Sequence, residues 1–248
     1  MAKATHLFPG PKQSGPDAER LRIKSPELVD ASLKYCTNCK RCEVACPSDV
    51  KIADLIQEAK WNYGKKHFSL RNFLLSRMDL MGKMLSPFSP IVNFFTGQRI
   101  IKFFMEKLMG IAAERTFPQF KTGSYVKWFN SEAPNQDSFP EKVVYFHGCS
   151  VNRMDHDLGK DLVTVLNAMN IGIEIPDQKC CGVPAIANGD VTRAKKNARF
   201  NINSLEKASG QEKKKIIQTC SSGSYALKYE YKHFLHPVSY THLTLPTN

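Results

Sequence analysis

Hydrophobic and polar positions follow two different periods in the second half of the chain. The apolar run at 143–146 is typical of a short buried strand, and alternating isoleucines at 171–175 indicate a second one. A third short apolar run lies at 216–217. Between these strands, apolar residues recur at helical spacing over 158–169, and a charged helix is predicted over 192–209. Strands that alternate with helices predict an α/β unit with a mainly parallel sheet.

The first half of the chain lacks strand patterns. Residues 1–30 are polar and rich in turn-forming residues, which predicts a linker. The apolar stretch over residues 91–113 predicts an amphipathic helix that is broken or weakened at Gly97 and Gly110. A loop rich in Ser, Asn, Asp and Pro at 131–140 is interpreted as a domain boundary.

Composition narrows the class of partner and the use of cysteine. The 248 residues include 35 Lys and Arg against 23 Asp and Glu, and this excess of 12 positive charges predicts an anionic partner surface. No module that reads a nucleic-acid groove is visible, so nucleic acid is not an expected partner. The eight cysteines fall into two sets, four within residues 36–46 and four at positions 149, 180, 181 and 220, and this clustering indicates metal binding rather than disulfides.

The first cysteine set has the C-x₂-C-x₂-C-x₃-C-P spacing of bacterial ferredoxins. Its members are Cys36, Cys39, Cys42 and Cys46, followed by Pro47. This spacing lets the chain wrap a 4Fe–4S cluster, and the charges of Lys40 and Arg41 are expected to favour its reduced form. Zinc is the alternative metal, but it prefers two ligand pairs separated by a long spacer.

The second cysteine set is spread along the chain, yet its members share one position in the predicted topology. Cys149, Cys180 or Cys181, and Cys220 each follow a predicted strand. Because the carboxyl ends of parallel strands share one edge of the sheet, we expect these cysteines to converge there. The alternative is an α/β core with incidental cysteines.

The order Cys149, Cys180-Cys181-Gly182, Cys220 resembles the cysteine-rich CCG domain. That domain occurs in the B subunit of heterodisulfide reductases and in iron–sulfur subunits of flavin dehydrogenases. The resemblance implies a second iron–sulfur cluster with Cys149, Cys180, Cys181 and Cys220 as candidate ligands. The family pattern closes with a second cysteine in CxxC, and Gly223 stands in its place here.

Further stretches carry a narrower resemblance. Residues 8–22, 34–51 and 146–149 are similar to iron–sulfur subunits of anaerobic sn-glycerol-3-phosphate dehydrogenases. The resemblance implies a subunit that relays electrons from flavoprotein catalytic subunits to membrane quinone in anaerobic respiration. It also implies that the subunit lies peripherally at the cytoplasmic face of the inner membrane and anchors the complex there.

Two departures from that family predict that the chain is a fragment. An upstream ferredoxin cysteine run and a second CCG repeat are both expected and are absent from the sequence. Residues 237–248 fit nothing before them and resemble the translated end of a sequencing adapter, so we exclude them from the fold.

The expected fold class is α+β, and it follows the order of the motifs. After the linker come a small ferredoxin-like iron–sulfur module at 31–62 and a basic amphipathic helical segment at 63–130. A βαβαβ CCG domain follows at 141–236. No secretory signal is visible, and charged residues interrupt the longest apolar stretch, so no membrane-spanning helix is expected.

The basic segment has two interpretations. Ile100, Phe104 and Leu108 share one helical face, with Ile111 one turn further on, while upstream lysines and arginines include Lys65, Lys66 and Arg71. An interfacial helix on anionic lipid is one interpretation, and a helix packed on catalytic subunits or core is the other.

Three functions from different classes remain open. The first is an electron-transfer subunit without a substrate site, because the sequence has no G-x-G-x-x-G flavin fingerprint. The second is a protein like heterodisulfide reductase, or a subunit like those of glycolate and lactate oxidases. The third is a zinc-bound interaction module, which the cysteine spacing favours least.

Overall fold

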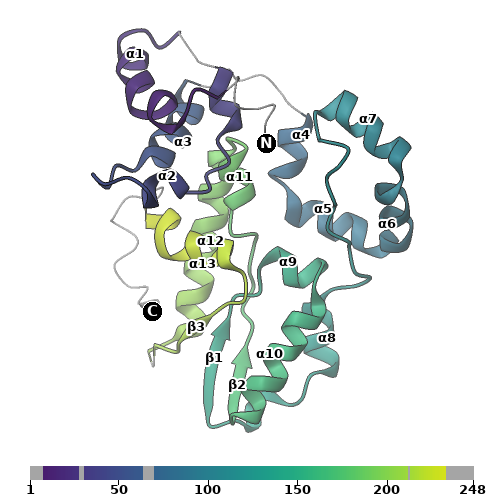
Figure 1. Ribbon diagram of the computed structural model, residues 1–248. Coiled ribbons are helices and arrows are strands. Elements are labelled where there is room, and N and C mark those ends of the chain that lie inside the picture. The colour runs from purple at the N-terminus through teal and green to yellow at the C-terminus, as the bar shows by residue number, and fades with distance from the viewer. Residues whose placement is uncertain (1–7, 28–30, 64–69, 212, 233–248) are drawn as a thin grey trace. The chain divides into compact units, whose positions relative to one another are not determined.

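The structure is a computed structural model that describes residues 8–27, 31–63, 70–211 and 213–232. The chain divides into two compact units, and Figure 1 shows the elements of each. Unit 1 lies within residues 1–76 and 184–191, and unit 2 lies within residues 77–183 and 192–248. Each unit buries a hydrophobic core of its own.

Unit 1 is helical throughout the part that the structure describes. Its elements are a π-helical segment (Gln13–Asp17), α1 (Ala18–Lys24), a 3₁₀ segment (Ala31–Tyr35), α2 (Arg41–Val44), α3 (Ile52–Asn62) and α4 (Leu70–Leu75). The apolar face of α3 is formed by Ile52, Ile56 and Ala59, which are buried in one cluster with Leu33. The cysteine set lies between the 3₁₀ segment and α3, next to this core.

The predicted linker is wrong for the residues that the structure describes. Arg22 of α1 is buried and donates a hydrogen bond of 2.7 Å to the carbonyl oxygen of Ser14. Gly15 lies so close to α3 that a Cβ atom there would stand 2.9 Å from Cγ2 of Ile52. The same small and polar residues that indicate a linker in the sequence allow this segment to pack closely against α3. The predicted ends of the linker at 1–7 and 28–30 lie outside the described residues.

Unit 2 begins with a series of helices. They are α5 (Met78–Leu85), a 3₁₀ segment (Ser86–Phe88), α6 (Ser89–Gly97), α7 (Arg99–Met109) and α8 (Tyr125–Glu132). The predicted helix over 91–113 is confirmed with both of its breaks. Gly97 ends α6, and Gly110 ends α7 with φ +64°, a left-handed conformation that glycine adopts without a steric penalty. No helix among the described residues is long and apolar enough to cross a membrane.

The rest of unit 2 is a parallel α/β unit, as predicted. A 3₁₀ segment (Gln136–Ser138) leads into β1 (Glu141–Tyr145), α9 (Gly148–Arg153), α10 (His156–Ala168) and β2 (Ile171–Glu174). Then come α11 (Val183–Ala187), whose residues from Pro184 belong to unit 1, α12 (Val191–Ser209), β3 (Ile216–Ile217), α13 (Ser221–Tyr225) and a π-helical segment (Ala226–Glu230). The strand order is β2-β1-β3, and both pairs are parallel.

The sheet is the middle layer between two helical layers. Alternate residues of β1 point to opposite faces, as the two-residue period of a strand requires. Val143 and Tyr145 pack with α8 and α10, whereas Val144 and the following Phe146 pack with α12 and the last helical segment. Because both faces are covered, the strands are apolar on both sides, which explains the continuous apolar run in the sequence.

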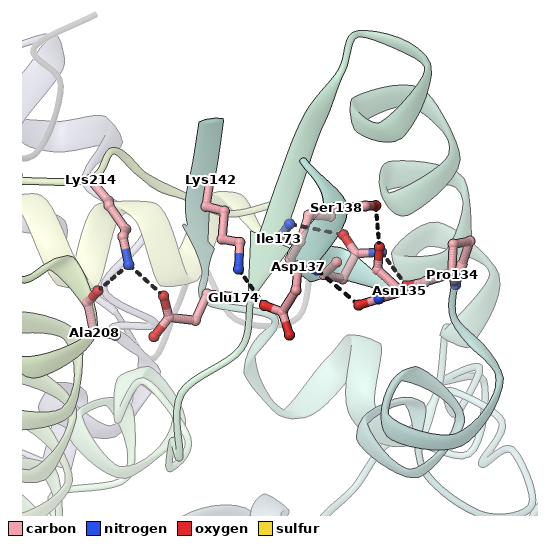
Figure 2. A network of polar contacts seen from close by, with 10 residues as sticks. Pro134, Asn135, Asp137, Ser138, Lys142, Ile173, Glu174, Ala208 and Lys214 are labelled. Carbon is pink, nitrogen blue, oxygen red and sulfur yellow. Dashed lines mark hydrogen bonds and ion pairs between the residues drawn. The ribbon is translucent and has the colours of Figure 1, made fainter. Parts of the chain in front are cut away.

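The polar loop before β1 is part of unit 2 and does not form the predicted domain boundary. Figure 2 shows its contacts with the sheet. The side chain of Gln136 accepts a hydrogen bond of 2.9 Å from the backbone N–H of Ile173 in β2, and Asp137 forms an ion pair with Lys142 in β1. The loop residues therefore attach this segment to both β1 and β2. The division between the two units instead falls between residues 76 and 77.

We predict that Gly159→Ala destabilises unit 2. A Cβ atom at Gly159 would lie 2.5 Å from Cε2 of Tyr125, whose fully buried ring occupies the space beside α10. We expect the free energy of unfolding, measured by urea denaturation, to fall by about 1–3 kcal/mol. Gly97→Ala is the matched control, because a Cβ atom at that position would meet no other atom within 4 Å. Equal losses in both variants would contradict the packing argument.

Candidate functional site

The first cysteine set wraps around one end of the unit 1 core. Cys36 follows the 3₁₀ segment, Cys42 lies in α2, and Cys46 lies between α2 and α3. All three pack against the buried cluster of Leu33 and α3, whereas Cys39 is exposed. The backbone between them turns sharply, because Asn38 adopts φ +57°.

Two hydrogen bonds to sulfur lie in this set. The backbone N–H of Val50 donates to Sγ of Cys46 over 3.4 Å, and Nε2 of Gln57 donates to Sγ of Cys36 over 3.5 Å. Gln57 is buried on α3, so its amide is held facing the sulfur. Donors of this kind stabilise negative charge on thiolate sulfur and influence the reduction potential of a cluster.

Burial is the main influence on the acidity of Cys42. Burial, followed by the negative charge of Glu43 and the neighbouring thiols of Cys36 and Cys39, raises the pKa of Cys42. Lys60 of α3 donates to the carbonyl oxygen of Cys36 over 2.5 Å, and burial lowers the pKa of Lys60. Binding of a cluster to Cys42 must therefore displace its proton, as thiolate coordination requires.

The expected effect of Lys40 on a cluster is modified by its partners. Its ammonium group forms ion pairs with Glu43 of α2 and Asp54 of α3, and Glu43 also accepts a hydrogen bond of 3.2 Å from the backbone N–H of Asp54. The lysine charge is thus compensated locally, and the main role of this side chain is to join α2 to α3. Arg41, by contrast, is exposed to solvent.

The second cysteine set lies at the carboxyl edge of the sheet, where the topology places it. Cys149 follows β1, Cys180 and Cys181 follow β2, and Cys220 follows β3. Sγ of Cys149 lies 3.6 Å from Sγ of Cys180 and donates a hydrogen bond to it. Cys180 and Cys181 are buried, and Cys220 is half-buried. The predicted convergence of these strand ends is confirmed for the pair Cys149 and Cys180.

A glutamine joins the two loops that carry this pair. Oε1 of Gln178 accepts a hydrogen bond of 3.0 Å from the backbone N–H of Gly148, and its Nε2 donates to the carbonyl oxygen of Tyr145 over 3.0 Å. Gln178 thus binds both sides of the turn that leads to Cys149, while it stands two residues before Cys180. This bridge positions the two sulfur atoms relative to each other.

Two asparagines of α12 hold the peptide groups before and after Cys180. Nδ2 of Asn197 donates to the carbonyl oxygen of Cys180 over 3.1 Å. Asn201, which is fully buried, accepts a hydrogen bond of 2.8 Å from the backbone N–H of Lys179 and forms a bond of 3.0 Å with the hydroxyl of Tyr231. The loop after β2 is therefore anchored by side-chain amides that satisfy its buried backbone groups.

The contact between the two sulfur atoms splits their acidity. The hydrogen bond from Cys149, together with one from Cys181, lowers the pKa of Cys180. The same bond and burial raise the pKa of Cys149. The proton of the pair is thus held on Cys149, and Cys180 is the acceptor. Such a pair is a sulfur donor set suited to metal binding or to thiol chemistry.

His147 precedes the cysteine that follows β1 and is buried beside the rings of Tyr125 and Tyr145. Burial lowers the pKa of His147 to about 4, so the imidazole is neutral at physiological pH. Its Nδ1 lies 2.7 Å from the carbonyl oxygen of Gly148 and donates to it, which places the lone pair on Nε2. The neutral ring therefore adds no charge next to the cysteines.

A cavity of about 440 Å³ opens at this edge of unit 2. Both Cys149 and Cys180 line it, together with His147, Gln178 and basic side chains. Beside Gly223, where the family pattern has a closing cysteine, the amide group of Gln218 lies 3.3 Å from the position of a Cβ atom. The side chain of Gln218 thus occupies the space next to that position.

Neither set forms a preformed metal site in the described part of the chain. No group of three or more His, Cys, Asp or Glu side chains is arranged there to hold a metal ion. The donor chemistry of both sets nevertheless fits iron–sulfur binding, because two sulfur atoms of the second set lie 3.6 Å apart and two thiols of the first set accept hydrogen bonds from N–H groups. Small metal sites commonly take their final geometry only when the metal binds.

The sequence pattern located the cysteines but missed the residues that position them. Gln57 looks like one polar residue of an amphipathic helix, and Asn201 like one of many in a charged helix. Their burial appears only when the helices pack. His147 and Gln178 stand shortly after predicted strands. Their position at the carboxyl edge of the sheet was therefore the one feature of the sequence that could have indicated a role at the site.

We predict that Asn201→Ala destabilises the loop after β2. The substitution leaves the backbone N–H of Lys179 and the carbonyl oxygen of Cys180 with fewer buried partners, at a cost of about 1–3 kcal/mol in the free energy of unfolding. Labelling of Cys180 by a thiol reagent should become faster as the loop opens. Asn203→Ala, which alters an exposed residue on the same helix, is the control and should change little. Similar values for both variants would rule out the anchoring role.

Comparisons with known proteins agree with this geometry. Residues 143–228 match the family model described as the cysteine-rich domain CCG. Over 229 residues the chain is 47% identical to the C subunit of anaerobic glycerol-3-phosphate dehydrogenase from Escherichia coli K12, a match that covers 92% of this chain and 58% of the relative. The chain thus spans less than two thirds of that relative's length.

More distant relatives are also named as iron–sulfur proteins. The chain is 26% identical to a probable glycolate oxidase iron–sulfur subunit of Bacillus subtilis, over 86% of this chain and 50% of that protein. It is 24% identical to an uncharacterized iron–sulfur protein of Methanococcus maripaludis, over 84% of this chain and 36% of that protein. No solved structure matches the chain. Residues 143–228 therefore match the cysteine-rich CCG domain, in a chain that is similar over nearly all of its length to the C subunit of anaerobic glycerol-3-phosphate dehydrogenase.

Proposed function

We propose that the chain is an iron–sulfur electron-transfer subunit. In this proposal it relays electrons from the flavoprotein subunits of an sn-glycerol-3-phosphate dehydrogenase to membrane quinone. The observation that carries the proposal is the first cysteine set, in which three thiols pack against one core and two of them accept hydrogen bonds from N–H groups. The similarity to a subunit of that dehydrogenase supports the choice of partner.

Cys36, Cys39, Cys42 and Cys46 are the residues that would hold a 4Fe–4S cluster in unit 1. When bound, such a cluster accepts and donates single electrons. The protein contributes the sulfur ligands, a buried apolar surface formed by Leu33 and α3, and the buried amide of Gln57. These residues exclude water from one side of the site, which lets the N–H donors act on the cluster without competition from solvent.

The second cysteine set is the proposed location of another iron–sulfur cluster. Cys149, Cys180, Cys181 and Cys220 are its candidate ligands, and all follow strands at the same edge of the sheet. Gln178 and the asparagines of α12 would hold the first two ligand loops in place. The family pattern has a further cysteine at position 223, where this chain has glycine. The side chain of Gln218 lies next to this position and would border the cluster instead of a fifth thiol.

The helices α6 and α7 support attachment to a membrane surface. Large apolar side chains on them are more than half exposed, namely Ile91, Phe94, Phe95, Ile100, Phe103, Phe104 and Leu108. Arg99 and Lys102 begin the same helix α7 on its other face. An apolar face flanked by basic residues fits a helix that lies in the interface of an anionic bilayer. We propose that the chain lies peripherally on the cytoplasmic face of the inner membrane.

A second candidate function is also electron transfer, but from a flavoprotein that oxidises a different substrate. The chain is similar to a glycolate oxidase iron–sulfur subunit and, over 93 residues, to lactate utilization protein A of Bacillus. These similarities favour an iron–sulfur subunit that accepts electrons from a 2-hydroxyacid oxidase. Copurification of the tagged chain with a flavoprotein, followed by assay of that complex with glycerol 3-phosphate and with glycolate or lactate, distinguishes the two. A role like that of heterodisulfide reductase needs no such partner.

We predict that anaerobic reconstitution with iron and sulfide loads about four iron atoms on the first cysteine set. Iron and acid-labile sulfide are measured per chain, and the dithionite-reduced sample should show an EPR signal near a g value of about 2. Cys42→Ser should remove this signal, whereas Cys149→Ser should keep it and lower only iron bound beyond the first four atoms. Binding of zinc instead of iron, or of no metal, would overturn the electron-transfer proposal.

We predict that α7 binds anionic vesicles. The full chain should float with vesicles that contain phosphatidylglycerol, and Phe104→Ser combined with Leu108→Ser should weaken binding by about tenfold or more, because both exposed side chains lose apolar area. Lys102→Glu should weaken binding through charge. Val165→Ser, which alters an exposed apolar residue on α10, is the control. Equal flotation of all variants would show that α7 does not bind lipid.

The basic residues Lys65 and Lys66, which the sequence analysis assigned to the same surface, lie outside the described residues. Arg71 of α4 lies in unit 1, and its Nε donates to the side chain of Asn72 over 3.1 Å. The membrane proposal therefore rests on α6 and α7 of unit 2 alone.

A further inference from the structure

The cavity of about 440 Å³ at the carboxyl edge of the sheet has a strongly basic wall. All of its lining residues lie in unit 2. Asp79 is the one acidic residue among them, whereas four are cations, namely Lys83, Arg153, Lys179 and Arg193. Arg193 forms an ion pair of 2.7 Å with Asp79, so three positive charges have no acidic counterpart in the lining. Such a wall attracts an anion.

The three remaining cations come from three different elements. Lys83 of α5 is exposed, whereas Arg153 of α9 and Lys179 in the loop after β2 are half-buried. Nη1 of Arg153 donates to the carbonyl oxygen of Gly123 over 3.1 Å, and Nζ of Lys179 lies 4.3 Å from the centroid of the Phe200 ring. These contacts position the two side chains but supply no anionic group. The cavity therefore offers three cations to a ligand that enters it.

An exposed apolar stripe begins at the edge of this cavity. Leu80 of α5 lines the cavity and is 46% exposed. Four apolar side chains follow it at intervals of three or four residues through the 3₁₀ segment into α6, and all are more than half exposed, namely Met84, Phe88, Ile91 and Phe95. Positions four apart lie on one face of a helix, so Leu80 and Met84 share a face of α5 next to the cavity. The stripe thus connects the basic cavity with the helices of the proposed membrane surface.

We propose that this cavity binds the phosphate headgroup of an anionic phospholipid, whose acyl chain lies against Leu80, Met84 and the apolar face of α6. The class of ligand follows from the two features together, because the cations select an anion and the adjoining apolar stripe selects a hydrocarbon tail. A free phosphate would use the first feature alone, and a neutral lipid the second alone. The inference rests on the proposed membrane attachment and extends it by naming the lipid class and the place of its headgroup.

The side chains of the wall suit a phosphodiester. Such a group is ionised throughout the physiological pH range, and its oxygen atoms accept charge-assisted hydrogen bonds from guanidinium and ammonium groups. Arg153 has five N–H donors, of which the contact with Gly123 uses one, and Lys83 and Lys179 have three each. An interfacial helix binds membranes through its apolar area together with electrostatic attraction to anionic lipid. A headgroup in the cavity would therefore add a specific contact to the apolar attachment of α6 and α7.

The test measures binding of three soluble probes to the full chain by isothermal titration calorimetry at low ionic strength. The probes are dihexanoylphosphatidylglycerol, dihexanoylphosphatidylcholine and inorganic phosphate, with both lipids below the concentration at which they form micelles. We expect the Kd of dihexanoylphosphatidylglycerol to be about tenfold lower than that of either other probe, because it alone combines a net negative headgroup with an apolar tail. Added salt should raise this Kd.

Charge variants test the headgroup site. Lys83→Gln combined with Lys179→Gln should weaken binding of dihexanoylphosphatidylglycerol by about tenfold, because two of the three uncompensated cations of the wall are lost. Lys127→Gln combined with Lys196→Gln is the matched control. It removes the same amount of charge from exposed positions on α8 and α12 that do not line the cavity, and it should leave the Kd nearly unchanged.

A second pair of substitutions tests the apolar stripe. Leu80→Ser combined with Met84→Ser should weaken binding of dihexanoylphosphatidylglycerol by about tenfold, because the acyl chains lose apolar contact area. The same variant should bind inorganic phosphate like the wild type, since phosphate does not reach the stripe. Val165→Ser, which alters an exposed apolar residue of α10, is the control and should bind both probes like the wild type.

Three outcomes would overturn the inference. If inorganic phosphate binds as tightly as dihexanoylphosphatidylglycerol, the cavity is a simple anion site and the stripe contributes nothing. If dihexanoylphosphatidylcholine binds as tightly, the basic wall does not select the headgroup. If the control pair of lysine substitutions weakens binding as much as the cavity pair, the attraction is a general effect of surface charge. The wild-type chain with the three probes gives a decisive comparison even if a variant does not fold.

Vesicle flotation of the wild-type chain separates this inference from the membrane proposal. A chain that floats with phosphatidylglycerol vesicles, but binds the three soluble probes equally, retains the proposed attachment through α7 and loses the headgroup site. A chain that does not float loses the proposed attachment, whatever the probes show. Iron loading of the first cysteine set is measured separately and reports on the electron-transfer proposal alone.

Discussion

The central position of β1 in the sheet is the constraint on which the second cysteine set depends. With β2 on one side and β3 on the other, the chain leaves β1 toward one neighbour and later returns on the opposite side. In open parallel sheets this reversal opens a crevice beyond the carboxyl ends of the strands. Cys149 stands at the end of the central strand, so it meets Cys180 across this crevice although 31 positions separate them in sequence.

Buried amide side chains then fix the two loops that carry Cys149 and Cys180, so that their sulfur atoms lie in contact. Gln178 hydrogen-bonds on both sides of the turn after β1, while Asn197 and Asn201 hold the peptides around Cys180. Each of these groups satisfies backbone atoms that would otherwise be buried without partners, so the loops have few alternative conformations. A cavity with basic walls and two sulfur atoms 3.6 Å apart is the result.

In unit 1 the cysteines are brought together by their spacing in the sequence rather than by the topology of a sheet. Tertiary packing adds the apolar floor from α3, the amide of Gln57 and the ion pairs of Lys40, none of which belongs to the cysteine motif. The same lysine that was expected to supply positive charge to a cluster instead joins α2 to α3, because two carboxylates lie within reach of its ammonium group.

Sequence alone determined the class of the fold, the strands and the helices α6, α7, α10 and α12 of unit 2, and the positions of all eight cysteines. These features follow from local periodicity and from residue spacing, which do not require knowledge of distant partners. Helix α1, the attachment of the loop at 131–140 to the sheet, and the unit boundary near residue 76 were decided by tertiary structure. So were the roles of Gln57, Gln178 and Asn201. The physical reason is that a polar residue in a helix or loop has the same local pattern whether it faces water or a buried peptide group, and packing against residues far along the chain decides between the two.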